Sequence, residues 1–320
     1  MTADAVITVR GLRKAYGGVV AVRELDLEVR AGEVLAFLGP NGAGKTTTVE
    51  ILEGFRDRDG GEVSVLGEDP ARAGSAWRAR IGVVLQESEP PGLLTVREAL
   101  ELFAGYFPRP RPVAETIALV GLEPQASQRA GRLSGGQKRR LDVAMALIGD
   151  PELLFLDEPT TGFDPAARRE AWEVIASLSA LGKTVFLTTH YMEEAQRLAD
   201  RVAIVQAGRI VAEGAPDALA GERAGEATIA FSPPAAELPA GLSAAPAPAA
   251  RGMVELRTER VVEDLAILTG WARERGHDLP GLTVTRPTLE DVYLELTASD
   301  SDYGSTPTPT VRRARGAGGR

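Results

Sequence analysis

The chain contains no cysteine, which excludes disulfide bonds and thiolate metal sites. It also lacks a long apolar run, since no segment approaches the about 18 residues that a membrane-spanning helix needs. The first residues carry no basic region followed by an apolar core, so we expect no secretory signal peptide. We therefore expect a cytoplasmic chain whose role at a membrane, if it has one, comes through a partner.

Histidine is scarce, with two residues, and acidic residues outnumber basic ones, which gives a net charge of -9. This charge argues against a generally nucleic-acid-binding surface, and we expect no nucleic-acid partner. The apolar content of 44 % is ordinary for a globular protein. Because 320 residues is long for one compact domain, we expect one large domain with an accessory piece.

What the sequence does contain is a glycine-rich turn between a predicted buried strand at 34–38 and a predicted helix from residue 48. A strand, such a turn, a Lys-Thr pair and a helix together form the phosphate-cradling loop. The turn consists of Gly39, Pro40, Asn41, Gly42, Ala43, Gly44, Lys45, Thr46 and Thr47.

Each residue type in this loop has a chemical use. Glycine lets the backbone approach phosphates and adopt positive φ, and the helix N-terminus directs its positive dipole at a polyanion. Lys45 adds a full charge near the β- and γ-phosphates, and the Thr46 hydroxyl can ligate Mg²⁺. The alternative, a plain glycine-rich turn before a helix, leaves the Lys-Thr pair unexplained.

A second signal is a run of large apolar residues at 153–156 that ends in Asp157 and Glu158. The run predicts a strand buried on both faces, as in a parallel sheet. Asp157 can then hold Mg²⁺, usually through water, and Glu158 can accept a proton from an attacking water. An acidic turn after a core strand is the alternative, which the phosphate loop upstream disfavours.

The remaining pattern places these motifs among strands and helices. Tyr16 lies in a predicted turn at 14–18, and a short apolar strand at 81–86 ends in Gln86. Helical periodicity from 94 to 122 is interrupted by prolines at 107–112. Further strands are predicted at 6–9, 25–29, 62–67, 184–189, 202–205, 209–212, 227–231, 254–258 and 282–285, and further helices at 113–120, 166–181, 192–199, 261–275 and 288–296.

We therefore predict a large domain at 1–222, with a helical subdomain at about 88–150, and a small accessory α+β module at 223–299. Residues 300–320 are rich in Ser, Thr, Gly and Pro and contain arginine, which predicts a disordered, solvated tail. Weak adhesion of these arginines to anionic lipid is the alternative.

A third motif consists of Leu133, Ser134, Gly135, Gly136 and Gln137, and Ser134 lies 23 residues before Asp157 (157 − 134 = 23). As an isolated pentapeptide it could be a helix N-cap. Together with the other two motifs it resembles the signature of the ATP-binding cassette family, the ATPase subunits of membrane transporters. The resemblance extends from residue 6 to about 219.

The resemblance implies that one copy of the chain binds ATP and Mg²⁺ through several of these residues. Tyr16 would stack on adenine, and the loop at 39–47 would hold the phosphates. Gln86 would touch Mg²⁺ or the attacking water and relay to a membrane partner. Asp157 and Glu158 would be the Mg²⁺ carboxylate and the general base.

The resemblance also implies a head-to-tail homodimer that sandwiches ATP. The signature at 134–137 would cap the γ-phosphate of ATP held by the other copy, and Asp164 would lie in a loop that crosses the dimer. His190, directly after an apolar strand, would contact the γ-phosphate, although by itself it equally fits a capping histidine. Phe163 departs from the family, which usually has leucine there, but keeps an apolar contact.

The implied fold class is α/β: a P-loop NTPase cassette with a mostly parallel core sheet, an antiparallel β subdomain, a helical subdomain and a small C-terminal α+β module. Residues 286–297 look like the end of cassette ATPases from daunorubicin-type drug exporters, and residues 136–141 fit the same group. Leu289, Val292, Tyr293 and Leu296 also have the spacing of an amphipathic helix, whatever the function.

We therefore expect the energy-coupling ATPase of an exporter, working in drug or antibiotic efflux. It would sit peripherally on the cytoplasmic face of the membrane, and a separate integral membrane permease would contact residues 87–107. A soluble cassette ATPase acting on ribosomes or DNA is one alternative, but such proteins typically carry two cassettes, long coiled coils or Cys-rich insertions. An importer ATPase is the other, and the C-terminal stretch argues weakly against it. The cargo is not encoded here, because the transport path lies in the partner.

Overall fold

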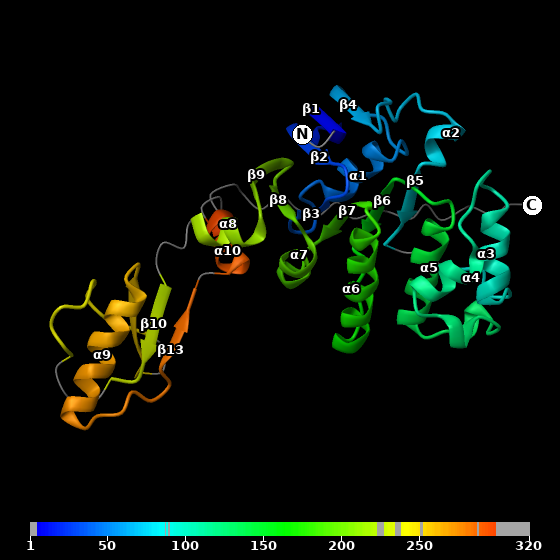
Figure 1. The fold of residues 1–320 in the computed structure, drawn as a ribbon. Coiled ribbons are helices and arrows are strands. Elements are labelled where there is room, and N and C mark those ends of the chain that lie inside the picture. Colours follow the sequence, from blue (N-terminus) through cyan, green and yellow to red (C-terminus); the bar gives the residue numbers. More distant parts are fainter. Residues whose placement is uncertain are drawn as a thin grey trace, which may run out of the picture.

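A computed structural model describes residues 5–86, 88, 90–222, 227–233, 238–249, 252–286 and 288–298. Figure 1 shows a large α/β body and a smaller module built around one helix. In the described residues no helix is both long and apolar enough to cross a membrane. The predicted tail at 300–320 lies outside the described residues.

The large body is organised around a six-stranded sheet in the order β5-β6-β7-β3-β8-β9. All neighbours pair in parallel except β8 and β9, which form the predicted antiparallel hairpin. The strands are β3 (Val34–Leu38), β5 (Ile81–Val84), β6 (Leu153–Asp157), β7 (Thr184–Thr189), β8 (Arg201–Gln206) and β9 (Arg209–Gly214). Every residue of β3, β6 and β7 is buried, as expected for a parallel sheet covered on both faces.

A second sheet, in the order β2-β1-β4, is antiparallel and confirms the predicted β subdomain. It consists of β1 (Ala5–Tyr16), β2 (Val19–Arg30) and β4 (Gly60–Val65). β1 and β2 are longer than predicted, β4 begins and ends two residues earlier than predicted, and Tyr16 ends β1 instead of lying in a turn. The ladder continues to the pair Tyr16 and Val19, because Gly17 and Gly18 make the reversal alone, with φ of 53° and 90°.

The helices cover the sheet and build the helical subdomain. They are α1 (Lys45–Leu52), α2 (Ser75–Arg78), α3 (Val96–Ala104), α4 (Val113–Leu119), α5 (Gly135–Leu147), α6 (Pro165–Ala180), α7 (Met192–Leu198) and α8 (Pro216–Glu222), with 3₁₀ turns at Glu123–Gln125 and Ala130–Arg132. The break between α3 and α4 falls at the prolines, as predicted. Leu100 of α3 and Leu141 of α5 share a core with Leu154 of β6, which fixes this subdomain to the sheet.

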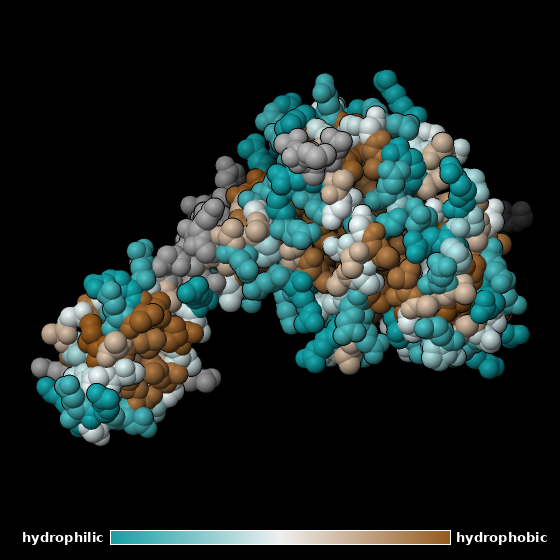
Figure 2. All heavy atoms as spheres, viewed as in Figure 1, coloured by the Kyte–Doolittle hydropathy of each residue, from teal (hydrophilic) through white to brown (hydrophobic). Residues whose placement is uncertain are grey.

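The smaller module has a sheet in the order β11-β12-β10-β13. Its elements are β10 (Ala227–Phe231), β11 (Ala247–Pro248), β12 (Val254–Thr258), β13 (Thr283–Thr285) and α9 (Val261–Arg275). Phe231 and Leu256 pack with Leu268 and Trp271 of α9 in a separate core. Figure 2 shows that hydrophobic side chains also gather on the surface of this module.

The last helix, α10 (Leu289–Ala298), departs from the expected domain division. It was expected in the accessory module, but Leu289 is buried with Leu38 and Ile204, and Tyr293 packs against the same cluster. The helix therefore lies beside α7 and α8 on the large body (Figure 1). The physical reason is that its apolar stripe completes a core on the cassette, while the module already covers its own core with α9.

Candidate active site

The phosphate loop leaves β3 and enters α1 at Lys45. Gly44 is the N-cap of α1 with φ of 99°, and a Cβ there would collide with the carbonyl oxygen of Ala21. The Lys45 ammonium donates to the carbonyl oxygens of Gly39 at 2.8 Å and Pro40 at 3.3 Å. The loop therefore curls around a buried cation, and the first N–H groups of α1, which have no acceptor within the helix, remain for a ligand.

Glu158 is the point at which the predicted catalytic residues meet. Its Oε1 lies 3.5 Å from Lys45 Nζ, and its Oε2 accepts from Gln86 Nε2 at 3.3 Å and from Thr161 Oγ1 at 3.1 Å. His190 Nδ1 is 3.3 Å from the same Oε2, without the alignment of a hydrogen bond. These groups come from four separate segments of the chain. They meet because each segment follows a parallel strand, and parallel strands end at the same edge of the sheet.

The neighbouring carboxyl, Asp157, is buried at the end of β6. The hydroxyl of Thr188 donates to Asp157 Oδ1, and the backbone N–H of Glu158 donates to that hydroxyl oxygen at 3.0 Å. Burial, and then repulsion from Glu158, raises the pKa of Asp157. A cation at this edge would lower that pKa and stabilise the charged form of Asp157.

A cavity of about 480 Å³ opens in front of the loop. It is lined by Tyr16, Ala21, Asn41, Gly42, Gly44, Lys45, Thr46, Thr47, Gln86 and Glu158. Tyr16 is 39 % exposed, and its ring centroid lies 5.4 Å from Lys14 Nζ and 5.3 Å from Arg56 Cζ. An aromatic face, a loop suited to a polyanion and the Glu158 carboxylate in one cavity have the chemistry of a nucleotide site.

The side-chain atoms beside the phosphate loop that could bind a metal ion are oxygens, and most of them are neutral. Within the described part of the chain no group of three His, Cys, Asp or Glu residues could hold a metal. The Thr46 hydroxyl, the Gln86 amide oxygen and the Asp157 carboxylate are hard ligands, which fit a Mg²⁺ that takes its remaining ligands from phosphate and water. They do not fit a softer metal that needs sulfur or several imidazoles.

The signature residues lie outside this cavity. Ser134 is the N-cap of α5 and accepts from the N–H of Gln137 at 3.3 Å, while Gln137 Oε1 accepts from the N–H of Ser134 at 2.9 Å. Asp164 likewise caps α6 by accepting from the N–H groups of Ala166 and Ala167, each at 2.9 Å. The side chains of Ser134, Gln137 and Asp164 are thus engaged in local capping, and Gly135 and Gly136 form the first turn of α5.

The sequence analysis did not single out Arg139, a residue of α5 whose side chain reaches the segments after β5 and β6. Arg139 is 7 % exposed, and its side chain donates to the carbonyl oxygens of Asp157 at 3.0 Å, Pro159 at 3.0 Å and Leu85. It also lies 3.9 Å from Asp142, three residues further along α5. That i, i+3 pairing was the available signal, but the three carbonyl contacts depend on the tertiary fold.

Glu194 of α7 was also missed, and the structure buries it completely. Its Oε1 accepts from Thr160 Oγ1 at 2.8 Å and from Trp172 Nε1 at 3.1 Å. Burial raises the pKa of this carboxyl. Glu194 thereby ties the segment after Glu158 to the helix that follows His190.

The sequence is similar to proteins of one family along most of its length. The family described as ABC transporter matches residues 22–161, and the ABC transporter domain-containing protein-like C-terminal domain matches residues 227–288. The daunorubicin resistance ATP-binding protein DrrA3 of Streptomyces coeruleorubidus is 40 % identical over 312 residues, covering 93 % of this chain and 98 % of that protein. The Nod factor export ATP-binding protein I of Burkholderia orbicola is 44 % identical over 308 residues, covering 92 % and 98 %.

Solved structures support the same assignment of fold. The ATP-binding cassette MJ0796, in a dimeric post-hydrolysis state bound to ADP and Pi, aligns with a TM-score of 0.59 and 25 % identity, covering 65 % of this chain and 98 % of that one. The cbiO1 protein of Clostridium perfringens, part of an ABC transporter complex, aligns with a TM-score of 0.62 and 28 % identity, covering 69 % and 92 %.

Proposed function

The chain belongs to the ABC transporter family, and from this premise we propose that it is an ATPase subunit that drives export through a separate membrane permease. The observation that carries the proposal is the convergence of Lys45, Gln86 and His190 on the carboxylate of Glu158. Relatives matched over nearly their full length are named for daunorubicin resistance and Nod factor export. For this chain we propose efflux of a drug-like or antibiotic cargo.

In the proposed site, ATP lies across the cavity with adenine on Tyr16 and the phosphates on residues 39–47. The exposed Tyr16 ring gives the base a face to stack on. Thr46, Gln86 and Asp157 would hold Mg²⁺, which when bound neutralises charge that develops on the phosphates. The mutual repulsion of Asp157 and Glu158 supports a cation at this place.

Glu158 is proposed as the general base. In the free chain Lys45 lies beside this carboxylate, and a bound phosphate would compete for the lysine. Glu158 would then be left to accept the proton of a water, while Gln86 and His190, each 3.3 Å away, orient that water and the γ-phosphate. The Thr161 hydroxyl, which donates to Glu158 Oε2, fixes the carboxylate in this position.

We further propose that the active form is a head-to-tail homodimer. Ser134, Gly135 and Gly136 lie outside the cavity that holds Lys45, so they can reach a γ-phosphate only when it is bound by another copy. Asp164, at the start of α6, would lie at the same interface. Hydrolysis removes the phosphate that bridges the copies, which converts the reaction into a motion.

The proposed place of the chain is the cytoplasmic face of the membrane, where it binds the permease through residues 87–107. The proposed domains are the cassette at 1–222 and an accessory module that begins near 223, with α10 packed back on the cassette. An importer subunit, or an ATPase acting on ribosomes or DNA, has no specific observation in its favour.

The variant Glu158→Gln tests this function. The amide keeps the shape of the side chain but does not accept the proton, so we expect ATP hydrolysis to fall about 10²–10⁴-fold. ATP should still bind and should trap a dimer, measured by size exclusion with light scattering, at concentrations where the wild type is monomeric. Glu152→Gln, which alters a surface ion pair with Arg80, is the matched control.

This experiment can refute the role of Glu158 as the base and the ATP-sandwiched dimer independently of each other. A Glu158→Gln chain that hydrolyses ATP at the wild-type rate removes Glu158 from the mechanism. A chain that has lost hydrolysis but stays monomeric in ATP keeps Glu158 as the base and refutes the ATP-sandwiched dimer.

A further inference from the structure

The imidazole of His190 reaches the active site with little polar support. Its Nδ1 lies 3.3 Å from Glu158 Oε2, but this nitrogen is buried and no hydrogen bond of the described chain reaches it. The side chain is also 33 % exposed, so surrounding core residues do not enclose it. A group that contacts a γ-phosphate has to be held at a fixed angle, since small misplacements cost rate. Another contact therefore has to set the orientation of this ring.

The neighbouring ring of Tyr191 makes such a contact. The centroids of the two rings are 4.0 Å apart, and their planes are tilted by 39°. Close aromatic pairs attract each other beyond the effect of the area that they bury. The N–H of Tyr191 donates to Thr189 Oγ1 at 3.0 Å, which fixes the backbone that carries both rings to the end of β7. Within the described residues the Tyr191 hydroxyl has no hydrogen bond, so packing alone holds the ring.

The guanidinium of Arg168 lies over the Tyr191 ring. Its Cζ is 4.4 Å from the ring centroid, within the about 6 Å over which a cation and an aromatic face attract. Arg168 belongs to the first turns of α6 and is half-buried. In the described chain Arg168 forms no ion pair, and its buried Nε has no hydrogen-bond partner. The ring of Tyr191 is therefore the contact that places this charge.

Helix α6 is a firm support for Arg168 because it is joined to α7. Trp172 Nε1 of α6 donates to the buried Glu194 of α7 at 3.1 Å. Arg197 of α7 also lies over the Trp172 ring, with its Cζ 5.3 Å from the centroid. The described residues thus show two cation–π contacts between these helical segments, and the one made by Arg168 adjoins His190.

A second effect of Arg168 is electrostatic. Burial raises the pKa of Glu194, and the charge of Arg168 opposes that rise. A role confined to this counter-charge would change the free energy of unfolding and would not depend on which residue stands at position 190. A role through the Tyr191 ring would change the rate of hydrolysis and would require the imidazole. The two roles therefore predict different measurements.

We propose that Tyr191 and Arg168 are positioning residues for ATP hydrolysis: the guanidinium holds the Tyr191 ring, and that ring holds the His190 imidazole toward the γ-phosphate. The inference rests on the proposed function, in which His190 orients the γ-phosphate. It makes α6 and the start of α7 part of the catalytic arrangement, although neither Tyr191 nor Arg168 lines the cavity beside the phosphate loop.

The first test separates turnover from binding. Tyr191→Ala and Arg168→Met in the full chain should each lower kcat about 10–100-fold and leave KM for ATP within about twofold, because the contacts to the base and the phosphates stay intact. Tyr191→Phe keeps the ring and should turn over like the wild type. Arg197→Met removes the other cation–π contact between α6 and α7 and is the matched control, with an unchanged kcat expected.

His190→Ala shows whether the proposed function or this inference fails. Loss of the group that contacts the γ-phosphate should lower kcat about 10²–10³-fold. A His190→Ala chain with the wild-type kcat refutes the role of His190 in the proposed function. A slow His190→Ala chain beside Tyr191→Ala and Arg168→Met chains of wild-type kcat overturns the inference alone. An equal loss in Tyr191→Phe and Tyr191→Ala also overturns it, because the ring would then not matter.

A double variant measures whether Arg168 acts through His190. In a chain that already carries His190→Ala, Arg168→Met should lower kcat by less than about twofold, because the ring that it positions is gone. A loss as large as the one in the wild-type background would show that Arg168 acts independently of the imidazole, and it would overturn the inference.

A spectroscopic test follows the imidazole directly. The chain contains two histidines, and the other, His277, lies in the accessory module with its ring centroid 5.4 Å from that of Trp271. In the full chain labelled with carbon-13 histidine, Arg168→Met should move the ring resonances of His190 and leave those of His277 in place. Arg197→Met should move neither set. An unchanged His190 resonance in Arg168→Met overturns the inference, even where turnover falls.

Discussion

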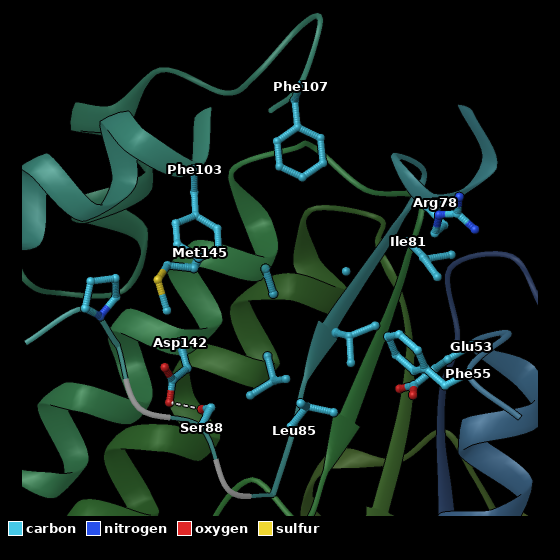
Figure 3. Close-up of a pocket in the computed structure, with 15 residues that line it drawn as sticks. Glu53, Phe55, Arg78, Ile81, Leu85, Ser88, Phe103, Phe107, Asp142 and Met145 are labelled. Carbon is cyan, nitrogen blue, oxygen red and sulfur yellow. Dashed lines mark hydrogen bonds between the residues drawn. The ribbon is translucent and has the colours of Figure 1, made fainter. Parts of the chain in front are cut away.

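The cassette has two cavities of nearly the same volume, about 480 and 470 Å³, and of opposite chemistry. The first lies at the phosphate loop, and the second lies where β5, α3, α5 and the end of α1 meet (Figure 3). In the first, the Glu158 carboxylate is surrounded by an ammonium, an amide, a hydroxyl and an imidazole from the same chain. In the second, Glu53 and Asp142 each bury an oxygen that the described chain leaves without a donor. The first cavity thus gives its carboxylate several partners, although His190 Nδ1 there also lacks a hydrogen bond, whereas the second leaves two carboxyl oxygens without a donor.

The same helices connect the two cavities. α1 begins at Lys45 in the first cavity, and Glu53, directly after its end, lines the second. Arg139 of α5 donates both to the carbonyl oxygen of Asp157, behind the first cavity, and to that of Leu85, which lines the second. Helix α1 and the side chain of Arg139 therefore join the two cavities. The following variants act on one cavity, on the connection, or on the other cavity.

The largest effect is expected from Lys45→Ala. Removing the one full positive charge of the phosphate loop should abolish detectable ATP turnover, a loss of at least about 10²–10³-fold. Binding of a fluorescent ATP analogue should weaken strongly as well. Lys183→Ala, which removes a surface pair with Asp150, is the control and should bind ATP normally. Normal hydrolysis by Lys45→Ala would refute the assignment of the site.

Arg139→Gln should disturb both cavities because it removes their connection. Loss of its contacts leaves buried carbonyl groups and Asp142 without their cation, so we expect the free energy of unfolding to fall by about 3–5 kcal/mol. Urea unfolding measures this change. Lys138→Gln, the half-buried neighbour on the same helix, should change it by less than about 1 kcal/mol. An equal loss of unfolding free energy in both variants would show that the carbonyl contacts of Arg139 do not stabilise the fold.

Tyr16→Ala should weaken ATP binding alone, by about 1–3 kcal/mol, the range for stacking of a base on an aromatic ring. Tyr16→Phe keeps the ring and should bind like the wild type. GTP and ATP should lose affinity equally, because a stacked face reads no hydrogen bonds. If calorimetry gives the same ATP affinity for Tyr16→Ala and the wild type, Tyr16 has no role in binding the base.

Taken over a single pH unit, the smallest effect is a pH dependence that belongs to the second cavity. The folded chain holds the Glu53 proton up to about pH 8, whereas its ordinary pKa is 4.5. Between these values the folded state binds more protons than the unfolded state. Stability is therefore fully present below pH 4.5 and is lost as pH rises toward 8. For Glu53 the slope is at most about 1.4 kcal/mol per pH unit.

Glu53→Gln should flatten this slope, measured by urea unfolding at several pH values. The carboxyls of Asp142, Asp157 and Glu194 also have raised pKa values and act in the same direction, so the difference from the wild type isolates Glu53. Glu115→Gln, on the surface of α4, should run parallel to the wild type. A parallel curve for Glu53→Gln would contradict the neutral, buried carboxyl.

Local sequence predicted much of the fold and of the candidate site. The strands around Lys45 and Glu158, the proline break before α4 and the hairpin of β8 and β9 each follow from nearest-neighbour patterns. The meeting of Gln86 and His190 at Glu158 follows from their positions after core strands, once the strands are known to be parallel. Arg139 was missed because its carbonyl partners lie 18 to 54 residues away in the chain.

The sequence by itself determined the phosphate loop, the paired carboxyls and the cassette fold, because the backbone geometry and charges that phosphate requires come from short, contiguous motifs. Only the tertiary structure decided where α10 packs, what Arg139 connects and that Glu53 shares a cavity with Asp142. Those outcomes depend on burial, and burial is set by which distant surfaces meet. A carboxyl at the end of a helix is ordinary in a sequence, and its pKa rises only when the fold removes it from water.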